Sequence, residues 1–172
     1  MEWLKYLVIE RDNCVRVNNW QQGAKYIKCS NGQLKCEINY VDGLIHGTGY
    51  YWRDNGKLWL ERNYVHNRRH GIQYCWYDNN QLLFENNYVN DRPNGIQHRW
   101  YENGQLCYEV NYINGLRYGI RRGWYRNGQL QYEENYDHDQ LHGIQRSWAE
   151  DGDMNYKDMF ENGVKQSRCI ML

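Results

Sequence analysis

The chain has 172 residues, in which 21 Lys+Arg balance 21 Asp+Glu, and it is rich in Gly (16), Tyr (17) and Trp (8) but has one Pro. Its mean hydropathy of −1.04 is typical of disordered chains, but 16% aromatic residues and zero net charge exclude disorder. The balanced charge also excludes the basic surface expected of a protein that binds nucleic acid.

The first segment, residues 1–22, shows no export or membrane signal. Its apolar run from Trp3 to Ile9 is interrupted by Lys5 and is too short for a secretion signal or a membrane span. The six cysteines form no C-x-x-C pair, so neither a zinc ribbon nor a disulfide framework is expected, and a reducing, cytoplasmic compartment is favoured. We expect this segment to be an N-terminal cap, with a hairpin that turns at residues 11–13.

Residues 23–163 repeat with a period of 24 residues and no insertion, which predicts six tandem repeats followed by a flexible tail, residues 164–172. The columns that define the repeat contain Trp52, Trp76, Trp100, Trp124 and Trp148; Tyr64, Tyr88 and Tyr112; and Gly71, Gly95 and Gly119. A further column, the glutamate column, contains Glu37, Glu61, Glu85, Glu109 and Glu133.

Each repeat reads as a β-hairpin, because two short runs of aromatic and β-branched residues flank an Asn-Gly type turn. A two-residue turn at Asn79-Asn80 would split the apolar columns between two faces. A three-residue turn over residues 78–80 pairs Trp76 with Leu82, and it requires positive φ at the column that holds Asn80 here and Gly in the other five repeats. We prefer the three-residue turn.

The preferred register places Tyr74, Trp76, Phe84 and Tyr88 on one face, as period-two alternation requires. On the opposite face it places the glutamate column in cross-strand polar pairs, a structural role. The expected pairs are Lys25 with Glu37, Gln73 with Glu85, Gln97 with Glu109, Arg121 with Glu133, and Gln145 with Lys157. The predicted fold is all-β, an elongated single-layer antiparallel sheet of six stacked hairpins.

The repeat unit, as written in residues 95–115 (G-I-Q-x-x-W-Y-x-N-G-Q-L-x-x-E-x-N-Y-x-x-G), resembles the MORN repeat, in the longer variant common in bacterial antitoxin-labelled proteins and large amoebal viruses. This resemblance implies an elongated β-sheet that acts as a scaffold, a dimerisation platform or a membrane-proximal module. Enzymes that carry such repeats have a separate catalytic domain. The Asn- and Tyr-rich wording favours a viral or protist source.

The chain ends in Cys169-Ile170-Met171-Leu172, which matches the C-a-a-X prenylation signal with a terminal Leu typical of geranylgeranyl. Lipidation of Cys169 would place the protein at the cytoplasmic face of a host membrane. The alternative is an ordinary unpaired cysteine in a frayed tail. One lipid chain gives only marginal anchoring without a second signal.

One column changes from tyrosine in the first three repeats to His98, Arg122 and Arg146 in the last three. With Arg117 and Arg126, these side chains could seat an anionic lipid headgroup or an acidic partner; a solvated charged face is the alternative. Histidines recur in two loop columns, but loop tips repeating at about 9 to 10 Å are too far apart for one ion. We therefore expect no metal, no cofactor and no catalytic residue.

These patterns favour a non-catalytic scaffold that binds a protein partner or a second copy of itself, with membrane tethering through Cys169. Two alternatives stay open. One is a module that binds anionic phospholipids, and the other is an antitoxin-like neutraliser of a paired toxin.

Overall fold

The computed structural model describes residues 15–16 and 22–166. These residues form strands and turns, and none of them lies in a helix. The chain divides into two compact units, Met1–Arg68 and Arg69–Leu172. The predicted all-β fold of antiparallel hairpin repeats is confirmed in both units.

The first unit contains two hairpins. Its strands are β1 (Val15–Arg16), β2 (Gln22–Lys28), β3 (Leu34–Val41), β4 (Leu44–Ile45), β5 (Gly47–Trp52) and β6 (Leu58–Val65). β2 pairs with β3, β5 pairs with β6, and β3 and β5 join the two hairpins. Cys36, Ile38 and Ile45 are buried at this junction. β1 pairs with β2; the rest of the predicted N-terminal cap, with its expected turn at residues 11–13, lies largely outside the described residues.

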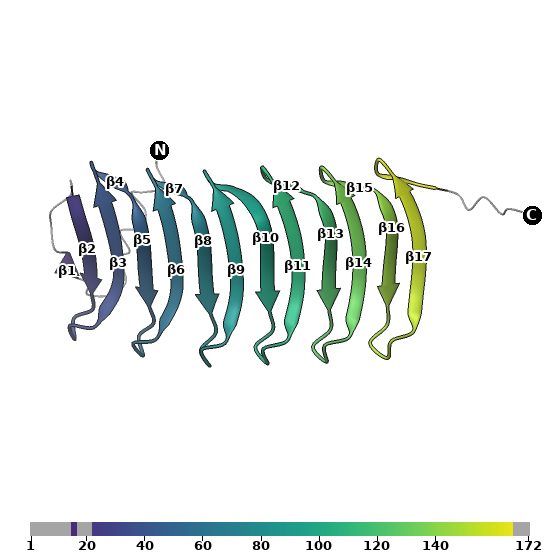
Figure 1. The fold of residues 1–172 in the computed structure, drawn as a ribbon. Helices are drawn as coiled ribbons and strands as arrows, with labels where there is room; N and C mark the ends of the chain where they lie inside the picture. Colours follow the sequence, from purple (N-terminus) through teal and green to yellow (C-terminus); the bar gives the residue numbers. More distant parts are fainter. Residues whose placement is uncertain (1–14, 17–21, 167–172) are drawn as a thin grey trace, which may run out of the picture. The chain divides into compact units, whose positions relative to one another are not determined.

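The second unit continues the pattern over four hairpins, which Figure 1 shows side by side. β7 (Arg68–Arg69) lies at the division. The remaining strands are β8 (Gly71–Trp76), β9 (Leu82–Val89), β10 (Arg92–Trp100), β11 (Leu106–Ile113), β12 (Leu116–Arg117), β13 (Gly119–Trp124), β14 (Leu130–Asp137), β15 (Gln140–Leu141), β16 (Gly143–Trp148), β17 (Met154–Glu161) and β18 (Val164–Lys165). β18 pairs with β17, so regular structure extends two residues into the segment predicted as a flexible tail.

The turns have the predicted three-residue form. In the β8–β9 hairpin, the N–H of Tyr77 donates to the carbonyl of Gln81 at 2.9 Å, and the N–H of Asn80 donates back to the carbonyl of Tyr77 at 3.1 Å. Asn80 has φ +67°, and the glycine that replaces it in the next repeat, Gly104, has φ +85°. The positive φ explains why this column accepts only Gly or Asn.

The register beyond the turn differs from the prediction by one residue. Trp76 pairs with Leu82 as expected, but Cys75 then pairs with Phe84, because Leu83 is an extra residue on the second strand, a β-bulge. The same bulge follows the first pair of every hairpin. The predicted pairs of the glutamate column are therefore wrong. The observed pairs are Tyr26 with Glu37, Tyr74 with Glu85, His98 with Glu109, Arg122 with Glu133, and Arg146 with Lys157.

The bulge also changes which side chains share a face. Tyr74 and Trp76, whose rings stack at 5.8 Å, lie on the same face as Glu85, and we call this the glutamate face. Phe84 lies on the opposite, tyrosine face, opposite Cys75, with Gln73 and Tyr88 on that same side. The prediction had placed Phe84 and Tyr88 with Tyr74 and Trp76. On the tyrosine face Gln73, Cys75, Gln97, Val110 and Gln145 are buried.

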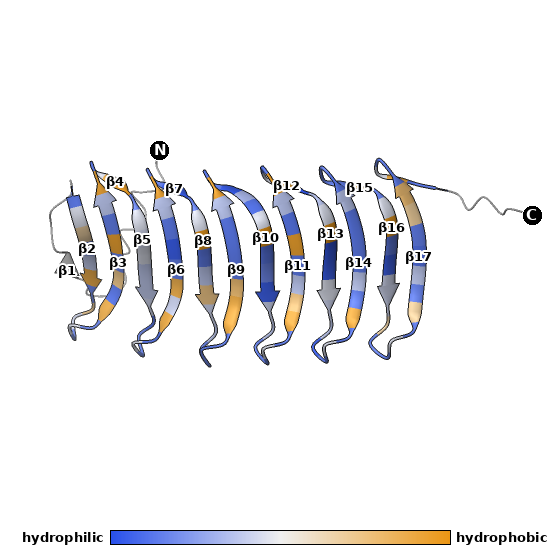
Figure 2. Ribbon diagram, in the orientation of Figure 1, coloured by the Kyte–Doolittle hydropathy of each residue, from blue (hydrophilic) through white to orange (hydrophobic). Residues whose placement is uncertain are grey.

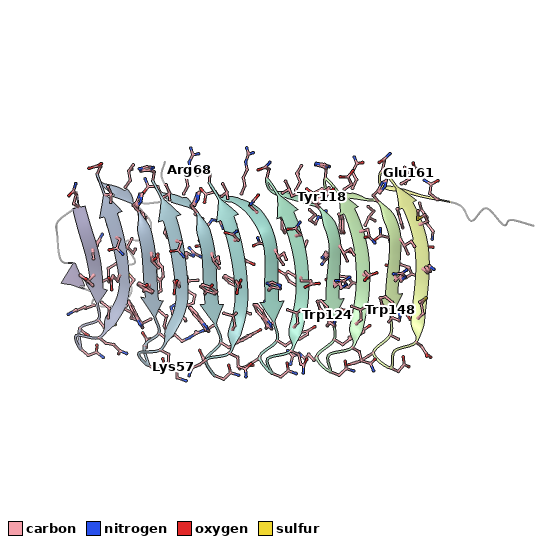
Figure 3. The ribbon with its side chains drawn as sticks, viewed as in Figure 1. Lys57, Arg68, Tyr118, Trp124, Trp148 and Glu161 are labelled. Atoms are coloured by element: carbon pink, nitrogen blue, oxygen red, sulfur yellow. The ribbon has the colours of Figure 1, made fainter. Side chains whose placement is uncertain are left out.

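In the second unit, hydrogen bonds with a 23-residue step connect each hairpin to the next. The hydroxyls of Tyr77, Tyr101 and Tyr125 donate to the carbonyls of Trp100, Trp124 and Trp148 at 2.8 to 2.9 Å. The turn asparagines Asn79, Asn103 and Asn127 donate to the following turn in the same way. Figure 3 shows Trp124 and Trp148 at the turn end of their hairpins, with Tyr118 at the opposite end. The recurring residues thus fix the spacing between repeats.

Candidate interaction surface

A chain of facing charges crosses the glutamate face of the second unit. The cross-strand pairing runs from Glu85 to His98, Glu109, Arg122, Glu133, Arg146 and Lys157, one residue on each of β9, β10, β11, β13, β14, β16 and β17. We call these seven residues the charge ladder. Acids and bases alternate along it until Arg146, which faces a second cation, Lys157. The described residues of the first unit form no equivalent ladder, because Glu37 faces Tyr26 and Tyr50 there.

Direct hydrogen bonds hold the centre of the charge ladder. Arg122 donates from Nη1 to Glu109 at 3.1 Å and from Nε to Glu133 at 3.0 Å. Arg146 donates from Nη1 to the other oxygen of Glu133 at 2.7 Å. The hydrogen bond to Glu133 is the main cause that raises the pKa of Arg122, with partial burial opposing it. Arg122 and Arg146, two of the residues predicted to seat an anion, are therefore already paired with carboxylates.

The other two predicted binding residues lie apart from the charge ladder. Arg117 ends β12 and Arg126 lies in the turn after β13, so the two are at opposite ends of that strand. Arg117 donates from Nε to Asp139 at 2.7 Å, and its guanidinium lies 4.1 Å from the ring centroid of Tyr136. Arg126 lies over the Tyr101 ring at 5.5 Å. The structure brings His98, Arg122 and Arg146 together in one row and leaves Arg117 and Arg126 outside it.

The pair of Arg117 and Asp139 gives a testable pH dependence. The side-chain hydrogen bond from Arg117, with a second from its backbone N–H, holds the pKa of Asp139 below its usual range. A lowered folded-state pKa stabilises the protein above the unfolded pKa of about 3.9, and the effect is lost as the pH falls through the folded value. We expect Arg117→Gln to return the Asp139 pKa towards about 3.9, as followed by the carboxyl carbon shift in an NMR titration.

Arg69→Gln is the matched control for that titration, because Arg69 makes the same contact with Asp91, at 3.0 Å, two repeats earlier in the chain. It should leave the Asp139 titration unchanged. An Asp139 pKa that Arg117→Gln does not move would contradict the assignment of Arg117 as its cause.

Exposed apolar side chains gather beside the charge ladder. Ile96, Ile113, Leu116 and Ile120 are all more than 40% exposed, and Ile96 reaches 53%. We call these four residues the isoleucine patch. They belong to β10, β11, β12 and β13, and it is their clustering on neighbouring strands that makes them informative.

Strand pairing places the isoleucine patch on the glutamate face. Ile113 pairs directly with Leu116, and Ile96 pairs with Asn111, two residues before Ile113 on the same side of β11. Glu109 of β11 pairs with Arg122 of β13. Two residues along each strand, Ile120 therefore lies opposite Asn111, on the side of β11 that faces β13. Figure 2 shows the setting: β10 and β13 are largely hydrophilic, and hydrophobic residues mark the start of β11 and β14.

Sequence reasoning missed both features. It placed the glutamate column opposite the wrong strand positions, so it paired Glu133 with Arg121 and did not connect Glu109 and Glu133 with Arg122 and Arg146. The signal that was present is the concurrent change of Tyr to His and Arg in the column that faces those glutamates. The isoleucine patch gave no signal, because the isoleucines read as ordinary strand residues.

The remaining predicted sites gain little from the structure. Cys169 lies outside the described residues, so its lipidation stays a prediction. Among residues 15–16 and 22–166 no group of three or more His, Cys, Asp or Glu side chains is placed to hold a metal ion. His46 and His66, one from each of the two histidine columns, have ring centroids 5.2 Å apart, and the neighbouring Asn67 side chain accepts the Ile45 N–H. Their rings meet edge to face.

Tandem antiparallel hairpins of 24 residues, which in the second unit are joined by hydrogen bonds that recur from one hairpin to the next, define a β-hairpin repeat protein. The family described as "MORN repeat variant" matches residues 45–66, 69–90, 93–114 and 117–138, together just over half of the chain. The chain therefore belongs to the MORN repeat family. Repeats of this family are commonly scaffold or membrane-binding repeats and are typically non-catalytic.

Comparisons with individual proteins add less. No curated protein sequence matches the chain. Two crystal structures of TarM are similar, one of them S. aureus TarM in complex with fondaparinux, α-GlcNAc-glycerol and UDP, at 13% and 14% identity with TM-scores of 0.41 and 0.40. They match 67% of this chain, which spans 23% and 22% of the TarM chains. Likeness at these TM-scores carries no argument.

The part of the chain that the structure describes contains no helix long and apolar enough to cross a membrane.

Proposed function

We propose that the protein is a non-catalytic scaffold that binds a protein partner through the glutamate face of its second unit. The observation that carries the proposal is the isoleucine patch. Exposed apolar side chains rimmed by polar groups are typical of protein interfaces. The charge ladder provides such a rim, because Arg122 and Glu109 lie two residues along β13 and β11 from Ile120 and Asn111.

The paired state of the ladder favours a protein over an anionic lipid as the ligand. A headgroup phosphate would have to compete with Glu109 and Glu133 for Arg122, and with Glu133 for Arg146. A protein surface can instead cover Ile96 and Ile120 and leave those ion pairs at the rim, where they cost little to keep. The phospholipid-binding module stays the second candidate, because Arg146 and Lys157 face each other without a carboxylate between them.

The experiment compares the wild type with the double variant Ile96→Glu, Ile120→Glu in affinity purification from the native cells. An apolar side chain that the partner buries should, when replaced by a charged one, reduce partner binding about tenfold or more for each residue. Val41→Glu is the matched control, because Val41 is an exposed apolar strand residue of the first unit, with an exposed fraction close to that of Ile120. A partner that is kept by the double variant, or lost equally in the control, would refute the patch as the binding surface.

Two further measurements separate the alternatives. Analytical ultracentrifugation of the wild type and the double variant tests whether the partner is a second copy. Flotation with vesicles of phosphatidylserine and phosphatidylcholine tests the lipid candidate, which requires binding that survives the patch changes and is lost on Arg122→Glu with Arg146→Glu. The predicted prenyl group on Cys169 would add a membrane anchor to either function, and the intact mass of the protein from eukaryotic cells, against Cys169→Ser, tests it.

A further inference from the structure

The last long strand, β17, has a side that the described residues cover only in part. On one side β17 pairs with β16 from Met154 to Phe160. On its other side, among the described residues, it pairs only with β18, at Phe160 and Glu161. The corresponding strands of the preceding hairpins accept a further strand there: β14 accepts β16 through Tyr132 and Glu133. The equivalent positions of β17 are Tyr156 and Lys157.

Lys157 inverts the charge that this position carries elsewhere in the second unit. Glu109 and Glu133 each face an arginine of the following strand, Arg122 and Arg146. Lys157 instead continues the charge ladder with a second cation opposite Arg146. Like charges directly opposite each other on neighbouring strands are unfavourable, and opposite charges are favourable. The side chain that complements Lys157 on a further strand is therefore a carboxylate.

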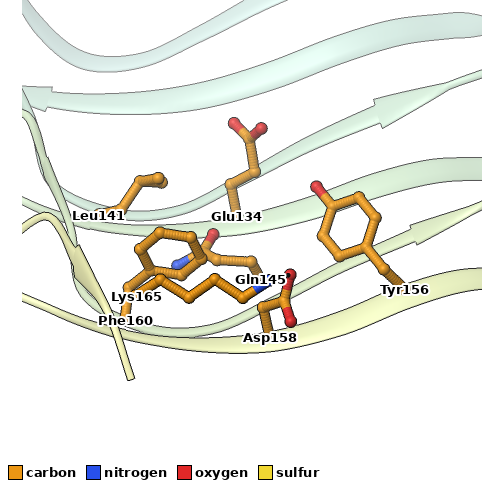
Figure 4. Close-up of a pocket in the computed structure, with 7 residues that line it drawn as sticks. All are labelled: Glu134, Leu141, Gln145, Tyr156, Asp158, Phe160 and Lys165. Carbon is orange, nitrogen blue, oxygen red and sulfur yellow. Dashed lines mark hydrogen bonds and ion pairs between the residues drawn. The ribbon is translucent and has the colours of Figure 1, made fainter. Parts of the chain in front are cut away.

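The same strand exposes apolar side chains on both faces. Met154, Tyr156 and Met159 are 54%, 43% and 51% exposed. On the tyrosine face beside this edge lies an open pocket of about 200 Å³, shown in Figure 4, with Leu141, Tyr156 and Phe160 among its lining residues and Lys165 and Asp158 bonded to each other at 2.8 Å. An exposed strand edge with apolar neighbours is a ready template for a further strand.

A buried glutamine accompanies two of the three strands added within the second unit, β10 and β16, whereas β13 has Arg121 at that position. Gln145, one residue before Arg146, accepts the N–H of Asn135 at 2.9 Å and donates to its carbonyl at 3.1 Å. Gln97 makes the second of these bonds, to Asn87, at 2.8 Å. The equivalent of Asn135 on β17 is Met159. The two carbonyls accept equivalent bonds: that of Asn135 from the His142 N–H at 2.9 Å, and that of Met159 from the Gln166 N–H at 2.8 Å. A glutamine next to the carboxylate would repeat these bonds.

We propose that the free edge of β17 docks an extended segment of a partner protein, antiparallel to β17, with an Asp or Glu opposite Lys157 and a Gln just before it. Main-chain hydrogen bonds supply affinity in such strand addition, and alternate side chains supply specificity. A second copy does not fit, because two β17 edges paired about this position would place one Lys157 against another. The inference rests on the proposed scaffold function but uses a different surface.

A lysine on an edge strand can also serve only to block aggregation. The test therefore uses two capped hexapeptides that copy β16, one with the native sequence Gly-Ile-Gln-Arg-Ser-Trp and one with Glu in place of Arg. Each is titrated into the ¹⁵N-labelled full chain and followed by amide NMR shifts. We expect the Glu peptide to shift the amides of residues 154–158 and to bind about fivefold to tenfold more tightly than the Arg peptide.

Charge reversal in the protein completes the test. Lys157→Glu should reverse the preference between the two peptides, and Lys157→Met should abolish it, with circular dichroism confirming that both variants fold. Equal affinity for the two peptides, shifts confined to other strands, or no binding by the wild type would overturn the proposal. So would binding that appears only after residues 167–172 are removed, since the chain itself would then be the occupant. None of these results affects the Ile96 and Ile120 experiment, so the two failures are distinguishable.

Discussion

Replacing Gln145 by leucine is expected to lower the free energy of unfolding by about 2 kcal/mol, although the side-chain volume hardly changes. Gln145 is only 1% exposed, and its amide makes hydrogen bonds to the backbone of Asn135 and to the carbonyl of Gly143. β14 and β16 pair directly only at two positions, Tyr132 with Ser147 and Glu133 with Arg146. Beyond those positions the Gln145 side chain takes the place of a strand partner for Asn135.

Leucine would leave the partly buried N–H of Asn135 without that partner, whereas the Asn135 carbonyl would keep its bond from His142. The substitution therefore removes the partner of one backbone donor. A donor left without a partner away from water is costly in free energy. Urea denaturation gives the overall loss. Hydrogen exchange of the Asn135 amide gives the local loss of stability, and this amide should exchange faster in the variant than in the wild type.

The matched control is Gln140→Leu, since Gln140 lies in β15 close by but is exposed. It should change stability by less than about 0.5 kcal/mol. A Gln145→Leu variant as stable as this control, with unchanged Asn135 exchange, would show that the side-chain bonds contribute nothing to the junction between hairpins.

The sequence predicted the hairpins and their turns because both are local. A positive φ at the last turn residue restricts the side chain to Gly or Asn, and the column that holds Gly104 and Asn80 records that restriction directly. Because the pattern is repeated six times, the prediction of a hairpin is better supported than it would be from one repeat alone. Turn type and hairpin spacing could therefore be determined from residues a few positions apart.

The faces of the sheet could not be predicted in the same way. They depend on the bulge at Leu83 and its equivalents, which are Lys35, Trp59, Cys107, Gln131 and Asn155. These residues share no size, charge or φ requirement, so the column carries no recognisable signal. A shift of one residue exchanges the faces of a strand, and it moved Glu133 from Arg121 to Arg122. The charge ladder was consequently hidden from a prediction that had identified every one of its residues.

The isoleucine patch was hidden for a different reason. Isoleucine in a strand reads as a core residue, and Ile144 in the same column as Ile96 and Ile120 is in fact half-buried. Exposure at Ile96 and Ile120 depends on what neighbouring strands and linkers cover, which a period-two pattern does not contain. A binding surface of this kind requires the register and the neighbours together.

Glu133→Gln is expected to lower the free energy of unfolding by about 1 to 2 kcal/mol. The Glu133 side chain is 15% exposed and bridges Arg122 at 3.0 Å and Arg146 at 2.7 Å. Loss of its charge leaves Arg122 with Glu109 alone and leaves Arg146 between an amide and Lys157. Because Arg122, Arg146 and Lys157 are at least partly exposed, the difference in unfolding free energy between the variant and the wild type should shrink in about 1 M salt. Glu85→Gln is the matched control, since Glu85 faces Tyr74 and His98 and should change stability by less than about 0.5 kcal/mol.

The same substitution tests what the ladder does for recognition. If the carboxylates keep the glutamate face from attracting anionic membranes, Glu133→Gln should increase binding to phosphatidylserine vesicles severalfold, as each net positive charge near such a surface contributes about 1 kcal/mol. Glu85→Gln, which removes one negative charge from the chain just as Glu133→Gln does but frees no arginine, separates this local effect from net charge. Equal vesicle binding by the two variants would mean that overall charge, and not the pairing of Arg122 and Arg146, sets the affinity of this face for lipid.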